Sequence, residues 1–209
     1  MAKAFIKLLD SDAAISNAIL AALAKEIGDS VTHSAKQLET SIRRVVREAI
    51  MNSPEISSLS NGDLRHDFGI PVGVDVATPI VNAIADSVVV RAAKIKVVGK
   101  SLSGGITIAI QPDDFSDLLS LPIAVVETAK GATLPWLHWL LNRGDSIIVA
   151  DFGVKYGAGL GRSAGAAMRA KLRPFKVNTQ FAGTSSDNFI TRALERYQSR
   201  IEDAVRRNI

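Results

Sequence analysis

Residues 134–194 read LPWLHWLLNRGDSIIVADFGVKYGAGLGRSAGAAMRAKLRPFKVNTQFAGTSSDNFITRAL and carry most of the information about the fold. Their first apolar run predicts a helix over residues 135–142, which the turn-forming sequence Asn-Arg-Gly-Asp ends. The next run predicts a buried strand over residues 146–156. Residues 157–174 are rich in glycine and predict a long loop, and residues 175–177 predict a short last strand.

A further helix closes this stretch. Ser186 or Asp187 can cap its start, because a short polar side chain there accepts a hydrogen bond from the first helical turn. Apolar positions then recur at three or four residues, the spacing of one helical face. They are Phe189, Ile190, Ala193, Leu194, Tyr197, Ile201 and Val205. We expect this face to pack on the sheet.

The N-terminal part of the sequence predicts one long amphipathic helix. Apolar residues recur at three, four or seven positions between residues 12 and 53, Ser11 or Asp12 can cap the start, and Ser53-Pro54 stops the helix. About 40 residues at about 1.5 Å per residue would span about 60 Å, roughly twice the width of a small domain. The helix therefore either breaks, near Gly28 or His33-Ser34, or projects and packs on a neighbour.

The middle of the sequence contains turn residues and two β-rich runs. Residues 54–86 predict a connector, with one short helix around 64–68 and a helical turn over 80–86. Residues 87–98 and the run ITIAIQ flank a Gly/Ser turn and predict an antiparallel hairpin. An acidic stretch over 112–120 suits the first turn of a helix, and residues 121–141 predict two helical segments separated by Gly131 and Pro135.

Together these elements predict an α+β fold in one domain over residues 1–209. It would consist of a long N-terminal helix (1–53), a connector (54–86) and a sheet-and-helix core (87–209) that includes the basic loop 157–174. We expect a small, mostly antiparallel sheet of about four strands, with the C-terminal helix packed on it.

Composition narrows the classes of protein. Hydrophobic residues make up 47% of the sequence, enough for a sizeable core. The most apolar stretch, residues 123–141, is broken by charged residues and proline, so we expect no membrane span. The start, MAKAFIKLLDSD, lacks the long apolar run of a secretory signal, which favours a protein that stays in the cytoplasm where it is made. The sequence contains no cysteine, so disulfides and cysteine metal sites are excluded.

Positive charge is concentrated in one region. The formal net charge is +4, which permits contact with nucleic acid without indicating a dedicated binder. Residues 152–186 contain six basic residues and no Asp or Glu. We expect four of the basic side chains to lie at a subunit interface or close to DNA: Arg162, Arg169, Lys171 and Arg173. A flexible glycine-rich loop could become ordered against a partner.

The sequence contains no recognisable catalytic, cofactor or metal motif. The histidines His33, His66 and His138 are far apart and do not pair at metal-ligand spacing. Ser163 lies in GRSAG, which is not a nucleophile elbow, and the alternating glycines 157, 159 and 161 match neither a dinucleotide fingerprint nor a P-loop. We therefore expect no enzymatic activity, no cofactor and no metal, with a Ser163 hydrolase as the least favoured alternative. We expect three aromatic residues to serve as packing anchors: Trp136, Trp139 and Phe189.

Several runs in the sequence resemble a known family. SPEISSLSNGDLRHDFGIP (residues 53–71), LPWLHWLLNRGDSIIV, GRSAGAAM, RPFKV and FAGTSSDNFITRAL are similar to tailed-bacteriophage neck and minor tail proteins, the tail-completion or head-tail joining group. Most of the resemblance lies in residues 134–194. Proteins of this group combine a long N-terminal helix, a small sheet and a C-terminal helix.

The resemblance implies a structural protein of the virion. It would be made in the host cytoplasm and would form a ring of six copies between the head connector and the tail tube. Its partners would be copies of itself, the neighbouring connector and tail proteins, and DNA that passes non-specifically through the channel. Two alternatives stay open: a tail terminator that caps the tail tube, and an accessory protein that binds nucleic acid without sequence specificity.

Overall fold

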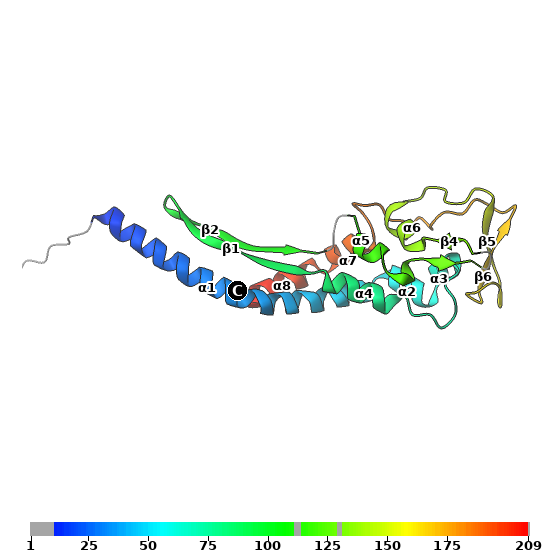
Figure 1. Cartoon of the computed structure of the whole chain (residues 1–209), viewed down its shortest axis with the longest axis horizontal. Helices are drawn as coiled ribbons and strands as arrows, with labels where there is room; N and C mark the ends of the chain where they lie inside the picture. Colours follow the sequence, from blue (N-terminus) through cyan, green and yellow to red (C-terminus); the bar gives the residue numbers. More distant parts are fainter. Residues whose placement is uncertain (1–10, 111–113, 129–130, 209) are drawn as a thin grey trace, which may run out of the picture.

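The computed structural model describes residues 11–110, 114–128 and 131–208. The molecule is elongated, and helix α1 runs along much of its length (Figure 1). We call one end the arm; it consists of residues 12–37 of α1 (Asp12–Met51) and the hairpin of β1 (Val89–Val98) and β2 (Ser101–Ala109). We call the other end the head; it contains the short helices within residues 54–67 and 136–142 and the short strands between residues 126 and 170. The predicted α+β class is confirmed.

Helix α1 (Asp12–Met51) is a single unbroken helix of 40 residues. Ser11 caps it as predicted, with its Oγ accepting a hydrogen bond from the Ala14 amide at 3.2 Å. The alternative of a break near Gly28 or His33-Ser34 is wrong. The helix continues because Ala24, Val31 and Leu38, spaced by seven residues, are buried on one face through this region.

Residues 54–86 form helices and supply core residues instead of acting as a connector. They fold into α2 (Pro54–Asn61), α3 (Asp63–Asp67) and α4 (Ala77–Asp86). The serines that read as linker residues cap and brace helices, because Ser53 Oγ accepts from the Ile56 amide and Ser58 Oγ accepts from the Leu64 amide.

The strands form three separate antiparallel pairs among the described residues, so the expected four-stranded sheet is not formed. The predicted hairpin is present as β1 (Val89–Val98) and β2 (Ser101–Ala109), joined by a two-residue turn. The other pairs are β3 (Val126–Glu127) with β4 (Thr133–Leu134), and β5 (Phe152–Tyr156) with β6 (Ala166–Ala170).

Two predictions fail because β6 lies inside the expected glycine-rich loop. β6 pairs with β5 and takes the place of the last strand expected at 175–177, which is reduced to a single bridge between Val149 and Phe175. The basic region is therefore a hairpin with a loop at residues 157–165, not a loop over 157–174.

The described residues between β2 and β5 form short elements. Besides β3 and β4, they are α5 (Ser116–Leu119), the 3-10 turn η1 (Pro122–Ala124) and α6 (Trp136–Asn142). Helix α6 was predicted, whereas the first half of 121–141 forms η1 and the β3–β4 pair instead of a helix. The acidic first turn expected over 112–120 includes Asp113, which lies outside the described residues.

The C-terminal helix is divided at Tyr197 into α7 (Phe189–Arg196) and α8 (Gln198–Asn208). Its cap is Asn188 and not Ser186 or Asp187: Asn188 Oδ1 accepts from the Ile190 amide, and Thr191 Oγ1 accepts from the Asn188 amide. Both helices pack along α1 instead of on a sheet, because α1 offers the continuous apolar face. The end of α8 reaches Ser41, where Asn208 Nδ2 lies 3.4 Å from Ser41 Oγ.

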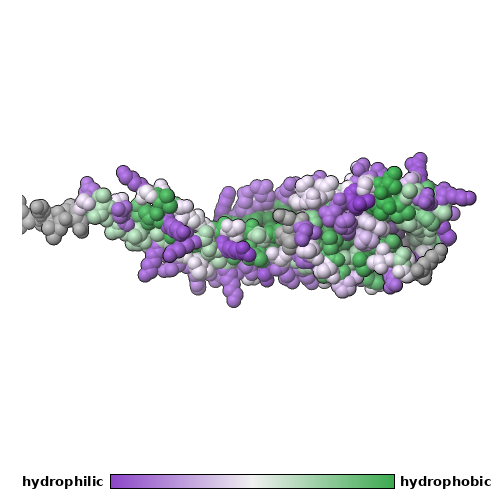
Figure 2. All heavy atoms as spheres, turned by 45° about the horizontal axis from the view of Figure 1, so that its top comes forward, coloured by the Kyte–Doolittle hydropathy of each residue, from purple (hydrophilic) through white to green (hydrophobic). Residues whose placement is uncertain are grey.

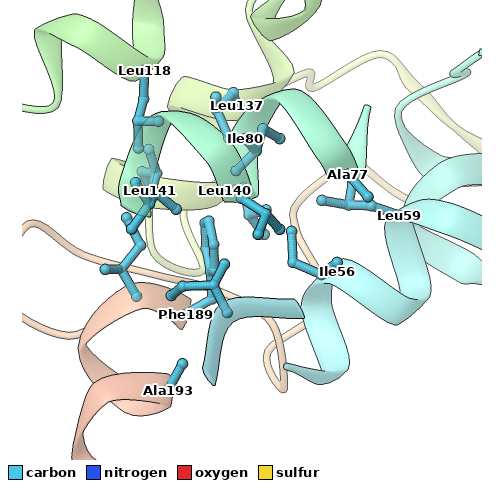
Figure 3. Packing of buried hydrophobic residues seen from close by; sticks show 14 of the residues in the cluster. Ile56, Leu59, Ala77, Ile80, Leu118, Leu137, Leu140, Leu141, Phe189 and Ala193 are labelled. Atoms are coloured by element: carbon cyan, nitrogen blue, oxygen red, sulfur yellow. The ribbon is translucent and has the colours of Figure 1, made fainter. Parts of the chain in front are cut away.

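The hydrophobic core fills the head and extends along α1 from Leu38 toward its C-terminal end. Ile56 of α2, Ile80 of α4 and Leu140 of α6 point toward one another, and Phe189 of α7 packs beneath them (Figure 3). An aromatic cluster extends the core, with the ring of Phe68 centred 5.4 Å from that of Trp136. Trp136 also donates a hydrogen bond from Nε1 to the carbonyl of Ile123 at 2.8 Å.

Candidate functional site

The β5–β6 hairpin, at the head end of the molecule, is the first candidate surface. Backbone hydrogen bonds order its loop: the Gly157 amide donates to Gly165 at 2.9 Å and the Gly159 amide to Ala164 at 2.8 Å. At Gly161, where φ is +63°, a Cβ atom would lie 2.1 Å from the Ala166 carbonyl oxygen, so only glycine fits. The hairpin is a defined structure, and its basic side chains have a fixed framework.

Of the four basic residues singled out in the sequence, Arg162 is anchored to the head. Its guanidinium donates to the carbonyl of Glu127, and its own carbonyl accepts from the Val72 amide at 3.2 Å. The guanidinium also lies beside Gly69, where an added Cβ would be 3.3 Å from Nη2. Arg162 thus fastens the hairpin loop to the head.

The other three, Arg169, Lys171 and Arg173, are exposed, and their side chains form no ion pair within the described part of the chain. Arg169 lies opposite Gly153 in the β5–β6 register and Lys155 opposite Ala167, so both belong to the same face of the hairpin. Val154 and Met168 lie on the other face and pack on the core. The basic face is therefore turned away from the head.

A groove borders this hairpin, with a volume of ≈ 560 Å³, between α3, β5 and residues 172–179. Its lining includes Arg173, Lys176, Asp67 and Tyr156. The Tyr156 hydroxyl donates a hydrogen bond to Asp67. Burial raises the pKa of Asp67, and this outweighs the opposing effect of that hydrogen bond; the pKa of Tyr156 is also raised, by burial and by its bond to Asp67.

Ser163 lies in this hairpin but is not placed for nucleophilic attack. It is buried, and its hydroxyl has no hydrogen-bond partner among the described residues. The neighbouring His66 has a buried Nδ1 that is likewise without a partner, so no serine–histidine hydrogen bond forms. Gly165 packs flat against the His66 ring, where a Cβ would lie 2.1 Å from Cε1.

The three histidines lie on α1, α3 and α6. No group of three or more His, Asp or Glu residues is close enough to hold a metal ion in the part of the chain that the structure describes.

The three expected packing anchors all lie in the hydrophobic core. Trp136 and Phe189 are fully buried and Trp139 is nearly so. Because they are covered by this chain's own helices, they stabilise the subunit and do not present a contact surface to another copy.

The arm is a second candidate surface, and it exposes hydrophobic side chains. Ile19, Leu23 and Ile27 of α1 are 55%, 42% and 41% exposed, and Figure 2 shows hydrophobic residues at the surface of the arm. They precede the part of α1 that α8 covers, because α8 ends opposite Ser41. A groove of ≈ 650 Å³ separates α1 from β1.

The arm also carries positive charge that our reading of the sequence missed. Strand β1 and its turn contain Arg91, Lys94, Lys96 and Lys100, all exposed, and residues 89–109 contain no Asp or Glu. These basic residues, without acidic neighbours, were visible in the sequence. We predicted the basic surface at residues 152–186 because that region contains more basic residues.

Comparisons of this chain with protein-family models, with curated proteins and with solved structures find no match. Within residues 11–110, 114–128 and 131–208, no helix combines the length and apolar character needed to span a bilayer.

Proposed function

We propose that this chain is a structural subunit of a tailed-phage neck, which assembles into a ring that joins the head connector to the tail tube. The observation that carries the proposal is the projection of α1 beyond the core with Ile19, Leu23 and Ile27 exposed. Most helical stability in proteins comes from packing of the apolar face, so a projecting helix with such a face favours a partner that covers it.

The shape of the subunit supports assembly through two different surfaces. A closed ring of identical copies requires heterologous contacts, in which one patch of a copy meets a different patch of the next. The exposed apolar side chains of α1 form one such patch, which would meet a different surface along the side of the next copy. The number of copies in the ring, six, rests on the sequence resemblance alone.

The exposed basic residues of the β5–β6 hairpin support proximity to DNA. Arg169, Lys171 and Arg173 could approach phosphates of any sequence, because a phosphate contact carries no base information. The virion is the proposed location, after synthesis in the host cytoplasm.

The double variant Leu23→Glu/Ile27→Glu tests the proposed assembly. It places charges on the exposed apolar positions of the arm without touching the core, so we expect an unchanged melting temperature and loss of rings in electron microscopy. Ala22→Glu, on another exposed position of the same helix, is the matched control and should still form rings. Rings that survive the double variant, or its normal incorporation into virion necks, would overturn the proposal.

A second candidate is an accessory protein that binds nucleic acid without sequence specificity. The six basic residues within 152–186, a region that contains no Asp or Glu, favour this candidate. Replacing Arg169, Lys171 and Arg173 together with Gln should then abolish salt-dependent retention of duplex DNA. If the triple variant also assembles normally into necks, DNA contact is dispensable for the structural role. A tail-terminator role would instead place the protein on tails that lack heads.

A further inference from the structure

The two edges of the β1–β2 hairpin differ in how they are protected. Helix α1 lies along β1, and the groove between them is lined by six consecutive residues of β1, Ala92 to Val97, and by none of β2. In Figure 1, β1 lies between α1 and β2. β1 also carries a bulge between Ala93 and Lys96 and three basic side chains. Helix cover, bulges and lysines are the usual means by which proteins blunt a strand edge.

Strand β2 has none of these protections. Its nine residues, SLSGGITIA, include no charged residue and no proline. In the part of the chain that the structure describes, β1 is its only strand partner, so its outer edge presents a row of unpaired backbone groups. A long, uncharged, open edge is a template for another strand.

We propose that a second copy of this chain pairs with this edge, β2 against β2 and antiparallel, about a two-fold axis. The result is a four-stranded sheet in the order β1, β2, then the partner's β2 and β1. The contact is isologous, so the same edge serves both copies. A second copy fits this edge because the sequence of β2 is self-complementary when two copies pair antiparallel.

One register pairs all nine residues of β2 with those of the partner. It places Gly105 on the axis and Ser101 opposite Ala109 of the partner subunit. Ser103 then faces Thr107 of the partner subunit, a pair whose hydroxyls can hydrogen-bond across strands. At Gly105 no heavy atom lies within 4 Å of the place that a Cβ would take, so the space on the axis is open.

The same register matches the apolar face of β2. Leu102 faces Ile108 of the partner subunit, and Ile106 faces Gly104 of the partner subunit. A slip by one residue would set apolar against polar positions on each face, so the alternation opposes it.

Charge favours β2 over β1 as the contact. Pairing through β1 would bring Arg91, Lys94 and Lys96 close to the same residues of the partner. In the proposed sheet the two β1 strands are separated by three strand spacings, about 14 Å, which exceeds the screening length of about 8 Å at physiological ionic strength. The inference uses β2 alone, whereas the proposed ring depends on the exposed residues of α1, so either can fail without the other.

Cysteine cross-linking tests the register directly, because the full chain has no native cysteine. Ser103→Cys mixed with Thr107→Cys should form a disulfide-linked dimer on oxidation, since these positions face each other. Either variant alone should cross-link weakly, because identical positions lie about 13 Å apart along the strands. Arg91→Cys mixed with Lys96→Cys is the control for pairing through β1 and should give no dimer. Cross-linking of that control, or none of the first mixture, would overturn the proposal.

A charge swap provides a second test that is independent of cysteine chemistry. Ser103→Lys/Thr107→Lys places lysine opposite lysine on both sides of the axis and should raise the dimer dissociation constant at least tenfold in sedimentation experiments. Ser103→Glu/Thr107→Lys places opposite charges there and should preserve the dimer. Circular dichroism checks that both variants are folded. A wild-type chain that sediments as a monomer up to high micromolar concentration, or equal dimerisation of both variants, contradicts the inference.

Discussion

Arg65 orders the loop between α3 and α4 through main-chain contacts. The side chain is largely buried and its guanidinium donates to the carbonyls of Ser60 and Val74, at 3.1 and 3.2 Å from Nη1, and to that of Pro71. Removing it would take guanidinium hydrogen bonds away from several part-buried carbonyls. We expect Arg65→Ala to lower the free energy of unfolding by about 2–4 kcal/mol in urea titrations.

Arg169→Ala is the matched control for that substitution. Its side chain is exposed, so the change should alter stability by less than about 0.5 kcal/mol. Equal effects of the two variants would mean that the contacts of Arg65 do not hold the loop.

Asp67 should make stability depend on pH. Burial raises its pKa above the ordinary value of 3.8, so the folded protein holds this proton more tightly than the unfolded chain does. The resulting stabilisation is complete below that ordinary pKa and is lost as the pH rises through the raised pKa. Asp67→Asn removes this dependence. In urea titrations, the unfolding free energy of Asp67→Asn minus that of wild type should therefore become larger from acid to neutral pH.

Tyr156→Phe provides the complementary measurement. The hydroxyl of Tyr156 donates to Asp67 and favours its carboxylate form, so removing it should raise the pKa of Asp67 further and steepen the pH dependence. Parallel stability curves for wild type and both variants would contradict this account.

The cap of α7 illustrates how far residue patterns predict local structure. The run Ser185-Ser186-Asp187-Asn188 offers adjacent capping residues, and the sequence could not choose among them. Asn188 is selected because it is buried and its backbone amide meets the Thr191 hydroxyl at 2.9 Å. That reciprocal contact depends on tertiary position, whereas the presence of a cap in this run was predictable.

Substitution of Gly28 tests whether α1 is a continuous helix in solution. It lies in the helix interior, and a Cβ atom there would meet Ile95 at 3.8 Å, which is ordinary van der Waals contact. Gly28→Ala should therefore stabilise the protein by about 0.5–1 kcal/mol, because alanine has the higher helix propensity and restricts the unfolded chain. Thermal unfolding followed by circular dichroism measures the gain.

Gly161→Ala should have the opposite effect in the same measurement, since the added Cβ would collide with the carbonyl of Ala166. A destabilised Gly28→Ala variant would indicate that the helix is hinged there in solution.

The strands were less predictable than the helices. The spacing in α1 predicted helix over residues 12–53 because a helical face repeats over many turns, and the sequence left open a break near Gly28 or His33-Ser34 that the structure does not have. Strand β6 has the sequence Ala-Ala-Met-Arg-Ala, which favours a helix or loop by propensity, and it becomes a strand only by pairing with β5. The sequence was enough to predict the candidate basic surface. That this surface is a hairpin, and that Arg162 fastens its loop to the head, could be seen only in the structure.

The distribution of charge over the whole molecule favours side-by-side packing of copies in the proposed ring. One end carries Lys94, Lys96 and Lys100, and the other carries Arg169 and Lys171 (Figure 1). End-to-end contact would bring like charges together, whereas lateral contact along α1 would bury exposed apolar side chains. The separation of strands into three pairs, instead of one sheet, could not be predicted from the sequence because strand pairing depends on the tertiary arrangement of the helices.

Hydrogen exchange should distinguish the two halves of α1 in the free subunit. Residues 38–50 lie against the core and under α7 and α8, whereas Ile19, Leu23 and Ile27 are exposed. Amides in residues 15–30 should therefore exchange faster than those in 38–50, measured by mass spectrometry of proteolytic fragments. In assembled necks the first segment should become protected, while the second serves as the internal control because it is already buried. Equal exchange of residues 15–30 in the free and assembled states would mean that the arm is not covered by a neighbour.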